Sequence, residues 1–440
     1  MLTASGLRRS APSITKHHKL SLHAPGRGAA PVNRLVVKIA DPLLMREINK
    51  YHVLETIRCF GRISRVEISE RTLLSGTTVS AITAALIDEG LIEAIHTGPV
   101  PEGQRGRPRV LLDLIPTAAY VVGIRISEAL TTTTIANFKG ETIASSQLPI
   151  RLARQAPNVI VDLIEDAVRE CIAKSGIDAS VIKGIGIGVP GIVDPRSGQS
   201  HASSVFGERE MPIAPLLEKR MGMPVKIEKP AHLVALAESW FGYAQRNRSF
   251  AVVTVDQTAG LGLWYEDDLL RGASALGPAF GHIKVGKDDR PCECGQQGCL
   301  NAYVSAAALR EDARAVMAPA FFDTALAGMN FMAALAENAH AGNAAAKALF
   351  ERQGEMLGIG VSHVINLFNP EKVIIAIENV TFRDLIAPAL RAAAERSSFR
   401  AHLASTELIF HTLDDQLWAR GAAALMLRDI YSAPWTAPSG

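Results

Sequence analysis

The sequence predicts an α/β protein in which a small winged helix-turn-helix unit precedes a much larger α/β domain. Two patterns support this fold class. Three short helical segments and two short apolar strands follow one another within residues 41–116, and strands then alternate with alanine-rich helices from about residue 120 to 430. With 440 residues, 48% of them hydrophobic, the chain is long enough for two or three domains with substantial cores.

Net charge, apolar runs and the positions of the cysteines indicate which kinds of protein the sequence can encode. The net charge of +2 is too small to indicate nucleic-acid binding by itself, so any basic footprint must be local. No apolar run reaches the roughly 18 residues of a membrane span, and we see no pattern of a secretory signal. We therefore expect a cytoplasmic protein in which the isolated Cys59 and Cys171 stay reduced.

Residues 1–40 are predicted to form a flexible basic arm. They are rich in Ser, Pro, Gly and Ala, and they carry seven basic residues but no acidic one. The arm suits a non-specific grip on DNA phosphates, and it also fits a solvated tail or a start codon placed too early. A short tail is expected at residues 434–440.

Two helices are predicted in the first part of the winged unit. Apolar residues recur at helical spacing over about residues 45–60. Ser64 and Glu67 then form the S-x-x-E capping box of a second helix. That helix is expected to carry Val66 and Ile68 inward.

A third helix is expected to begin after the N-cap Ser75 and to stop at Gly90, with an apolar face formed by Val79, Ile82 and Leu86. Its outward positions carry hydroxyl and methyl groups, and none of them is the Arg, Lys, Asn or Gln that makes bidentate base contacts. We expect phosphate contacts and modest base contacts, with a methyl group against thymine.

A wing is predicted after the helices. Short strands at 91–95 and 110–114 flank the loop GPVPEGQRGRPR, whose Arg105 and Arg107 would enter a narrow, A·T-rich minor groove. A winged helix used for protein contacts is the alternative, although a basic wing has little purpose without phosphates. The predicted DNA-binding residues are Ser75, Thr77, Thr78, Ser80, Ala81, Thr83, Arg105 and Arg107.

The larger domain is predicted to open with three consecutive strands, at 120–126, 131–138 and 142–149, with Lys139-Gly140 as a turn. A helix over about 158–174 and a buried strand at 182–189 follow. The glycines in GIGVPGIVDP are not followed by the helix that dinucleotide binding requires, so we interpret this stretch as a strand and turn that shape the floor of a cleft. Near the C-terminus, a helix over about 344–368 precedes a strand at 372–377.

The stretch HIKVGKDDRPCECGQQGC, which runs from His282 to Cys299, predicts a zinc site. A thiolate pair one residue apart, a third thiolate and one imidazole can close a tetrahedral shell around Zn²⁺. Gly295 and Gly298 supply the positive φ angles of a tight loop. The alternative is a loop of reduced cysteines. Because four protein ligands fill the shell, the site is expected to be structural. The predicted ligands are His282, Cys292, Cys294 and Cys299.

The chain resembles the ROK family of repressors, open reading frames and sugar kinases, in particular its winged-helix transcriptional repressors. The resemblance covers about residues 45–430 and is carried by VLETIRCFGRISRVEISERTLLSGTTVSAITAALIDEGLI, RGRP, GIGVPGIVDP, ALAESWFG, Gly281-His282 and CECGQQGC. It implies a two-lobed actin-like, RNase-H-like domain at 117–433, with a small lobe at about 117–240 plus the C-terminal helix and a large lobe at about 241–418. It also implies a His282 and cysteine zinc site, operator DNA as partner, and a homodimer or homotetramer.

Several positions depart from the pattern of the family's kinases. Arg125 stands where the resemblance implies an Asp followed by a phosphate-binding Gly-Gly-Thr loop, and Pro230 stands where it implies the aspartate general base. Ala279 and Asn301 replace two glutamates, and Ile377-Glu378 replaces a glycine pair. We therefore predict no catalytic residues and no enzyme activity: the chain would be a DNA-binding regulator, a repressor of carbohydrate-related genes. The alternative is an active ATP-dependent ROK sugar kinase fused to a DNA-binding domain, which would release ADP in the presence of a sugar.

The cleft of the larger domain is expected to bind a carbohydrate-derived effector. Lys229 and His232 replace two asparagines of the sugar motif and shift the site towards positive charge, which favours an anion such as a sugar acid or sugar phosphate. In the alternative, Lys229 faces solvent and His232 is a satisfied core histidine. In a third hypothesis, the cleft binds no effector, and a protein partner regulates the chain by sequestering it. The predicted ligand-binding residues are Pro190, Gly191, Lys229, His232 and His282.

Overall fold

The computed structural model describes residues 42–96, 110–127, 130–149, 152, 155–203, 205–286, 290–326, 331–377, 380–413 and 415–431. The chain divides into the units Met1–Pro42 and Leu43–Gly440, and the fold belongs to the second. The predicted basic arm and C-terminal tail lie outside the described residues. No helix in the described ranges is both long and apolar enough to cross a lipid bilayer.

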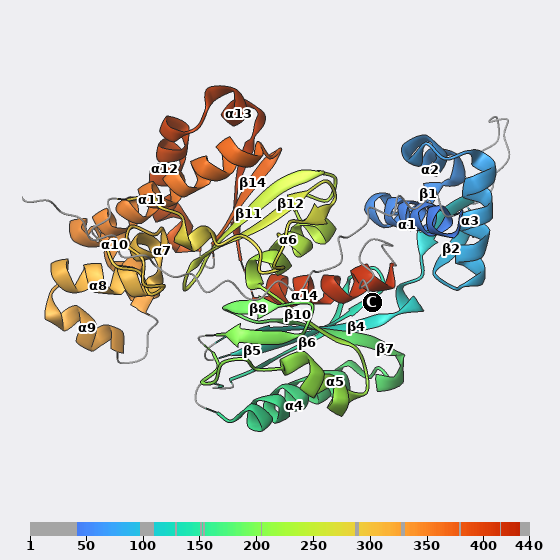
Figure 1. The fold of residues 1–440 in the computed structure, drawn as a ribbon, viewed down its shortest axis with the longest axis horizontal. Coiled ribbons are helices and arrows are strands. Elements are labelled where there is room, and N and C mark those ends of the chain that lie inside the picture. Colours follow the sequence, from blue (N-terminus) through green and yellow to red (C-terminus); the bar gives the residue numbers. More distant parts are fainter. Residues whose placement is uncertain are drawn as a thin grey trace, which may run out of the picture. The chain divides into compact units, whose positions relative to one another are not determined.

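The N-terminal part of the fold is a winged helix-turn-helix unit (Figure 1). Its helices are α1 (Pro42–Phe60), α2 (Arg65–Thr72) and α3 (Gly76–Asp88). Strands β1 (Ile63–Ser64), β2 (Ile92–His96) and β3 (Val110–Leu114) form an antiparallel sheet in the order β1-β3-β2. The sequence did not predict β1, because two residues are too few to show an alternating pattern.

The capping box predicted for α2 is confirmed: the Ser64 side chain accepts from the Glu67 backbone, and the Glu67 side chain accepts from the Ser64 backbone. The prediction that Val66 and Ile68 both point inward is wrong for Val66, which is 67% exposed, whereas Ile68 is fully buried. Residues two apart on an α-helix point about 200° apart, so only one of the two can face the core.

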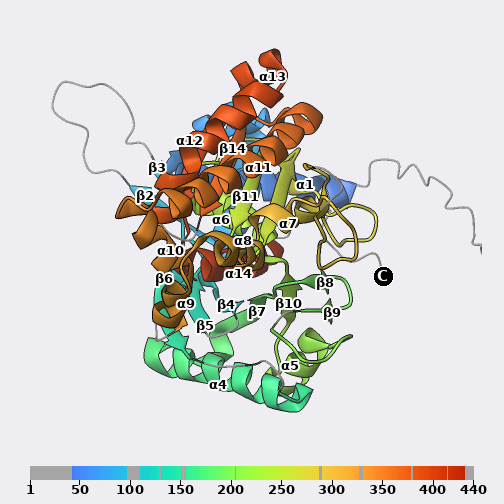
Figure 2. The same ribbon diagram turned by 90° about the vertical axis from the view of Figure 1, so that its left-hand side faces the viewer.

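The first lobe contains a five-stranded sheet in the order β10-β7-β4-β5-β6. The strands are β4 (Tyr120–Ile126), β5 (Thr131–Asn137), β6 (Thr142–Leu148), β7 (Ile182–Gly188) and β10 (Val225–Glu228). Helices α4 (Pro157–Ser175) and α5 (Ile213–Met221) pack against this lobe (Figure 2). A short hairpin of β8 (Ile192–Asp194) and β9 (Gln199–Ala202) follows the Pro190-Gly191 turn.

The second lobe contains another five-stranded sheet, in the order β13-β12-β11-β14-β15. Its strands are β11 (Ser249–Val255), β12 (Ala259–Tyr265), β13 (Asp268–Leu269), β14 (Lys372–Ile377) and β15 (Glu407–Thr412). The long helices α11 (Ala344–Phe368) and α12 (Val380–Ser397) pack on each other beside it. Shorter helices are α7 (Asn301–Val304), α8 (Ala306–Val316), α9 (Pro319–Leu326), α10 (Phe331–His340) and α13 (Arg400–Ser405).

Two helices connect the lobes. The C-terminal helix α14 (Asp415–Ile430) packs on β4, β5 and β7, and it also packs on α6 (Pro230–Phe241). Helix α6 in turn packs on β11 and β12 of the second sheet (Figure 1). Gly123 and Gly186 allow this packing, since a Cβ on either would lie within 2.0 Å of an α14 carbonyl oxygen. Gly186 therefore leaves space for α14 to pack on β7. This packing is a structural role, as predicted for the glycines of GIGVPGIVDP.

Candidate functional site

The exposed face of α3 is a row of small side chains. Thr77, Ser80 and Ala81 are exposed, as the prediction requires, and Ala84 extends the same face. The N-cap Ser75 fixes the start of the helix, because its hydroxyl accepts from the backbone of Thr78 at 3.1 Å. This face offers hydroxyl and methyl groups at the end of a helix where backbone N–H groups favour anions.

Thr83 was predicted to contact DNA, and the structure shows that this assignment is wrong. Its side chain is fully buried, its hydroxyl accepts from Arg65 Nε at 2.8 Å, and it donates to the carbonyl of Ser80 at 3.2 Å. Thr83 therefore connects α2 to α3 and is unavailable to a ligand. Arg105 and Arg107 lie in the wing loop, which is outside the described residues.

A buried charged group lies at the start of α6. Glu228 is fully buried, and its carboxylate accepts from His232 Nδ1 at 2.8 Å and from Arg271 Nε at 2.8 Å. Burial raises the pKa of Glu228, but His232 and Arg271 outweigh burial and lower the pKa to about 2. His232 is also fully buried, and its Nε2 has no hydrogen-bond partner among the described residues.

Lys229, the N-cap residue of α6, lies against the loop at 276–278. Its ammonium donates to the carbonyls of Leu276 and Pro278, at 2.8 and 3.2 Å. Burial lowers the pKa of Lys229, and Glu228 partly compensates. The alternative in which Lys229 faces solvent is therefore wrong, since the amine is half-buried and bonded within the chain.

The Pro190-Gly191 turn is close to the same group. The Val189 amide, one residue before the turn, donates to the Glu228 carbonyl at 3.0 Å. Gly191 has a φ of +105°, and a Cβ there would lie 2.1 Å from the Ala202 carbonyl oxygen, so the turn requires glycine. Within the predicted ligand-binding set, Lys229 and His232 both contact Glu228, the Pro190-Gly191 turn follows a residue that is bonded to the Glu228 backbone, and His282 lies with the cysteines.

Arg125 connects the two lobes. From the end of β4 it pairs with Asp256, which follows β11, at 3.5 Å, and with Asp415, the first residue of α14. Its guanidinium also lies over the Trp418 ring, 5.0 Å from the centroid. Arg125 is only 9% exposed, and two carboxylates already balance its charge. This position consequently offers little attraction to a nucleotide phosphate.

The donor atoms of His282, Cys292, Cys294 and Cys299 all lie within 4.8 Å of one another. Cys292 Sγ is 3.6 Å from His282 Nδ1, and Cys294 Sγ is 3.8 Å from Cys299 Sγ. A tetrahedron with Zn–S bonds of about 2.3 Å has sulfur–sulfur edges of about 3.8 Å, so the donor set fits zinc.

The backbone around these donors forms a tight knuckle. Gly295 and Gly298 have φ angles of +84° and +71°, as predicted, and the Cys292 amide donates to the Gln296 carbonyl at 2.8 Å. Asn301, two residues after Cys299, accepts from the Ala259 amide at 3.0 Å. Asn301 thus connects α7 to the start of β12, at a position where the resemblance implies a glutamate.

Sequence reasoning missed three charged residues of these sites. Arg271, Asp256 and Asp415 reach their partners from other elements of the chain, and no local motif marks them. The only available signal was that Asp256 ends a buried strand and Asp415 begins a helix.

Comparisons with known proteins cover both parts of the fold. Residues 121–429 match the ROK family, and residues 46–93 match a winged helix-turn-helix DNA-binding family. The xylose repressor of Caldicellulosiruptor bescii is 28% identical over 395 residues, which cover 89% of this chain and 98% of that protein. The DNA-binding transcriptional dual regulator NagC of Escherichia coli is 25% identical over 392 residues, covering 89% and 95%.

Solved structures share the fold. A ROK family transcriptional regulator, described as a homologue of the E. coli MLC protein, aligns with a TM-score of 0.73 at 24% identity and covers 88% of this chain and 97% of its own. A ROK family glucokinase from Streptomyces griseus, in complex with glucose and AMPPNP, has a TM-score of 0.59 at 24% identity and covers 70% of this chain and 99% of its own. The glucokinase alignment is shorter, whereas the regulator alignment covers most of both chains.

Proposed function

The chain belongs to the ROK family, and on that basis we propose that it is a DNA-binding transcriptional regulator that represses carbohydrate-related genes. The observation that carries the proposal is the combination of a winged helix-turn-helix unit, with its α3 face exposed, and a ROK domain in one chain. Relatives named as xylose and N-acetylglucosamine repressors match both parts together. Such a regulator acts where the chromosome lies, in the cytoplasm.

The α3 face supports DNA contact through Ser75, Thr77, Thr78, Ser80 and Ala81. Their hydroxyls suit phosphate oxygens, and methyl groups suit thymine, while Arg105 and Arg107 of the wing would supply charge in the minor groove. One winged helix covers only a short stretch of duplex. A homodimer or homotetramer that reads paired half-sites is therefore the expected assembly.

A genome-wide map of the sites bound by the intact protein tests this proposal. We expect a small number of strong sites with two similar half-sites, upstream of carbohydrate genes. Deleting the gene should raise transcription of the neighbouring genes. Uniform occupancy without preferred sites, or unchanged transcription after deletion, would contradict the proposed function.

The ROK domain is proposed to lack kinase activity. Arg125, paired with Asp256 and Asp415, stands where a kinase needs a phosphate-binding loop. Pro230 has no group that could take a proton from a sugar hydroxyl, and the loss of a general base costs on the order of 10²- to 10⁴-fold in rate.

An ADP-release assay over a panel of sugars separates the regulator from the alternative, a sugar kinase fused to a DNA-binding domain. We expect release no faster than with ATP alone. Turnover that depends on one sugar would establish the alternative.

The buried group at α6 supports an anionic effector. Arg271 and Lys229 lie beside the Glu228 carboxylate, and Arg271 also pairs with Asp268 at 3.8 Å. His232 Nε2 adds a polar atom without a partner among the described residues. A carboxylate or phosphate on a sugar would accept charge-assisted hydrogen bonds from such a site. In the alternatives, His232 is only a core histidine, or a protein partner regulates the chain and the cleft binds nothing.

Calorimetry with glucose, glucuronate and glucose 6-phosphate examines the charge preference. Tighter binding of the two anions supports the assignment, and tighter binding of neutral glucose would rule it out. His232→Ala should weaken binding of the anions, whereas the distant exposed substitution Thr142→Ala should not.

The cluster of His282, Cys292, Cys294 and Cys299 is proposed to hold a structural Zn²⁺. Its geometry matches a closed tetrahedral shell, and a closed shell leaves no open position for substrate or water. Bound zinc would fasten the loop before α7 to the large lobe, whose core includes Cys292 and Cys299.

A further inference from the structure

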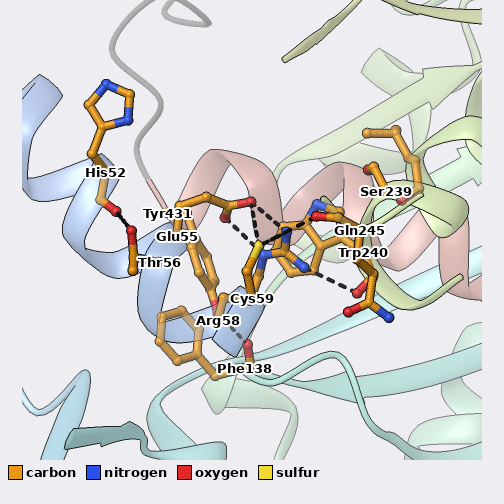
Figure 3. Close-up of polar contacts among 11 residues, drawn as sticks. His52, Glu55, Thr56, Arg58, Cys59, Phe138, Ser239, Trp240, Gln245 and Tyr431 are labelled. Carbon is orange, nitrogen blue, oxygen red and sulfur yellow. Dashed lines mark hydrogen bonds and ion pairs between the residues drawn. The ribbon is translucent and has the colours of Figure 1, made fainter. Parts of the chain in front are cut away.

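Helix α1 of the winged unit ends against the C-terminal end of α6 (Figure 3). Arg58 Nη1 donates to the Trp240 carbonyl at 3.1 Å, and its guanidinium lies 4.4 Å from the centroid of the Trp240 ring. The last carbonyls of a helix lack partners within the helix and carry partial negative charge. Arg58 of the winged helix-turn-helix unit therefore caps α6 of the ROK domain.

Glu55 holds the Arg58 side chain in place. Its carboxylate accepts from Arg58 Nε at 2.8 Å and from Nη2 at 2.5 Å, one helical turn away on α1 (Figure 3). Burial raises the pKa of Glu55, but Arg58 outweighs burial and leaves that pKa below its ordinary value. The pair stays charged, and with 6% of its side chain exposed Arg58 is shielded from competing water.

Cys59 lies beside this pair. Its thiol is 3.2 Å from Arg58 Nη2 and 3.7 Å from the Gln245 carbonyl. Burial raises the pKa of Cys59 to about 11, so the thiol form dominates near neutral pH. The neutral thiol leaves the charge balance between Glu55 and Arg58 unchanged.

An open pocket lies beside the contact around Arg58. It has a volume of about 490 Å³ and is lined by residues of α1, the end of α6, the β12–β13 turn and α14, among them Tyr51, Trp240, Trp264 and Tyr431. Because solvent space lies next to Arg58 on this side, the polar contacts of Arg58 with Glu55 and Trp240 are a main connection between α1 and α6 there.

Helix α6 links this contact to the buried charged group. Lys229 is its N-cap and His232 lies in its first turn, whereas Trp240 lies in its last turn. Twelve residues span about 18 Å at 1.5 Å per residue. Most of α6 is buried against α14 and the second sheet, and the helix is continuous from its N-cap Lys229 to Phe241.

We propose that Arg58 is a positioning residue that transmits displacement of α6 to α1, and so couples the buried group at Glu228 and His232 to the orientation of the DNA-binding unit. The inference rests on the proposed function, since a coupled α1 has a purpose only if the winged unit binds DNA. The physical coupling itself requires neither DNA nor an effector. It can therefore be tested independently.

The test is a double-mutant cycle read by hydrogen exchange of the full-length protein. Arg58→Ala should raise exchange of peptides from residues 50–60 and 239–247 by about tenfold or more, because it removes a buried hydrogen-bonded charge. Glu228→Gln perturbs the other end of α6, and it should raise exchange in residues 50–60 only when Arg58 is present. Arg58→Lys keeps the charge without the paired geometry and should lie between Ala and wild type.

Arg169→Ala is the matched control, because Arg169 also pairs with a glutamate on its own helix but lies on α4. It should leave exchange in residues 50–60 unchanged. The inference is overturned if Arg58→Ala leaves α1 exchange unchanged, or if the effects of Arg58→Ala and Glu228→Gln simply add. Should Arg58→Ala fail to fold, the same cycle with Arg58→Lys decides between coupling and additivity. Failure of DNA binding would leave these exchange results intact, so the two proposals fail separately.

Discussion

Glu228 is a carboxylate with no exposed surface, and three donors maintain its charge. His232 and Arg271 bind its two oxygens, and the Lys229 amide donates to it at 3.0 Å. A buried ion with a complete set of partners costs little, whereas removing one partner leaves the others desolvated and unpaired.

Glu228→Gln should therefore lower the free energy of unfolding by about 3 kcal/mol at pH 7. The folded-state pKa of about 2 lies below the ordinary value of 4.5, so the stability from ionised Glu228 is complete above pH 4.5 and is lost as pH falls towards 2. The difference between wild type and variant should be constant from pH 7 to 5 and shrink below 4.5, as measured by denaturant unfolding.

Glu170→Gln is the control for an exposed glutamate, since Glu170 pairs with Lys174 on the surface of α4. It should change the free energy of unfolding by less than about 1 kcal/mol. A Glu228→Gln effect as small as that of the control, or one that grows as pH falls below 4.5, would contradict the assigned charge state.

At the scale of single residues, the sequence predicted several residues of the candidate sites but few of the residues to which they form hydrogen bonds or ion pairs. Lys229 and His232 were predicted to belong to one ligand-binding set, and both contact the Glu228 carboxylate. Arg271 approaches the same carboxylate from a loop that no motif marks. Thr83 was misassigned because its hydroxyl was taken as a sign of exposure, although its spacing from Val79, Ile82 and Leu86 places it on the buried face of α3. The sequence does not show that Arg65 of the preceding helix is its partner.

Among the structural elements, the knuckle from His282 to Cys299 has the clearest chemistry. Its four donors were identified from spacing, and its two positive-φ glycines fit a loop around an ion. Lys284 Nζ lies 3.6 Å from Cys299 Sγ, so an ammonium group lies beside the proposed metal ligands.

The purified protein should contain about one zinc per chain by elemental analysis. Cys299→Ser, or prolonged exposure to a strong chelator, should remove the metal and lower the melting temperature, because zinc stabilises the folded state that presents its ligands. Exchange should rise in residues 280–304.

Cys171→Ala provides the control, because Cys171 is buried on α4, away from the cluster. This variant should retain its zinc. Protein that is free of zinc as purified, and whose melting temperature does not respond to chelator, would contradict a structural metal site.

Elements with strong local signals were predicted closely. The observed bounds of α11, β3, β4 and β14 equal the predicted ranges, because apolar periodicity and flanking turn residues mark their ends. The inward placement of Val66 failed because the sequence does not reveal which face of a short helix meets the core.

For the whole molecule, two five-stranded sheets with α6 and α14 between them bring distant segments together. Arg125 near the start of the ROK domain meets Asp415 near its end, and Arg58 of the winged unit meets Trp240 at the end of α6. Such pairs depend on packing between elements that are far apart in sequence. The family resemblance predicted the two lobes, but these contacts required the structure.

The proposed function requires this chain to read a specific DNA sequence through α3. The most direct measurement is the affinity of the intact protein, by fluorescence anisotropy at 150 mM salt, for a duplex from its strongest mapped site and for a shuffled duplex. We predict a preference of at least about 1,000-fold. Thr77→Glu should lose most of the affinity by repelling phosphate, whereas Thr142→Glu, an exposed position on β6, should bind normally. Equal affinity for the two duplexes, or equal binding by the two variants, would contradict the claim.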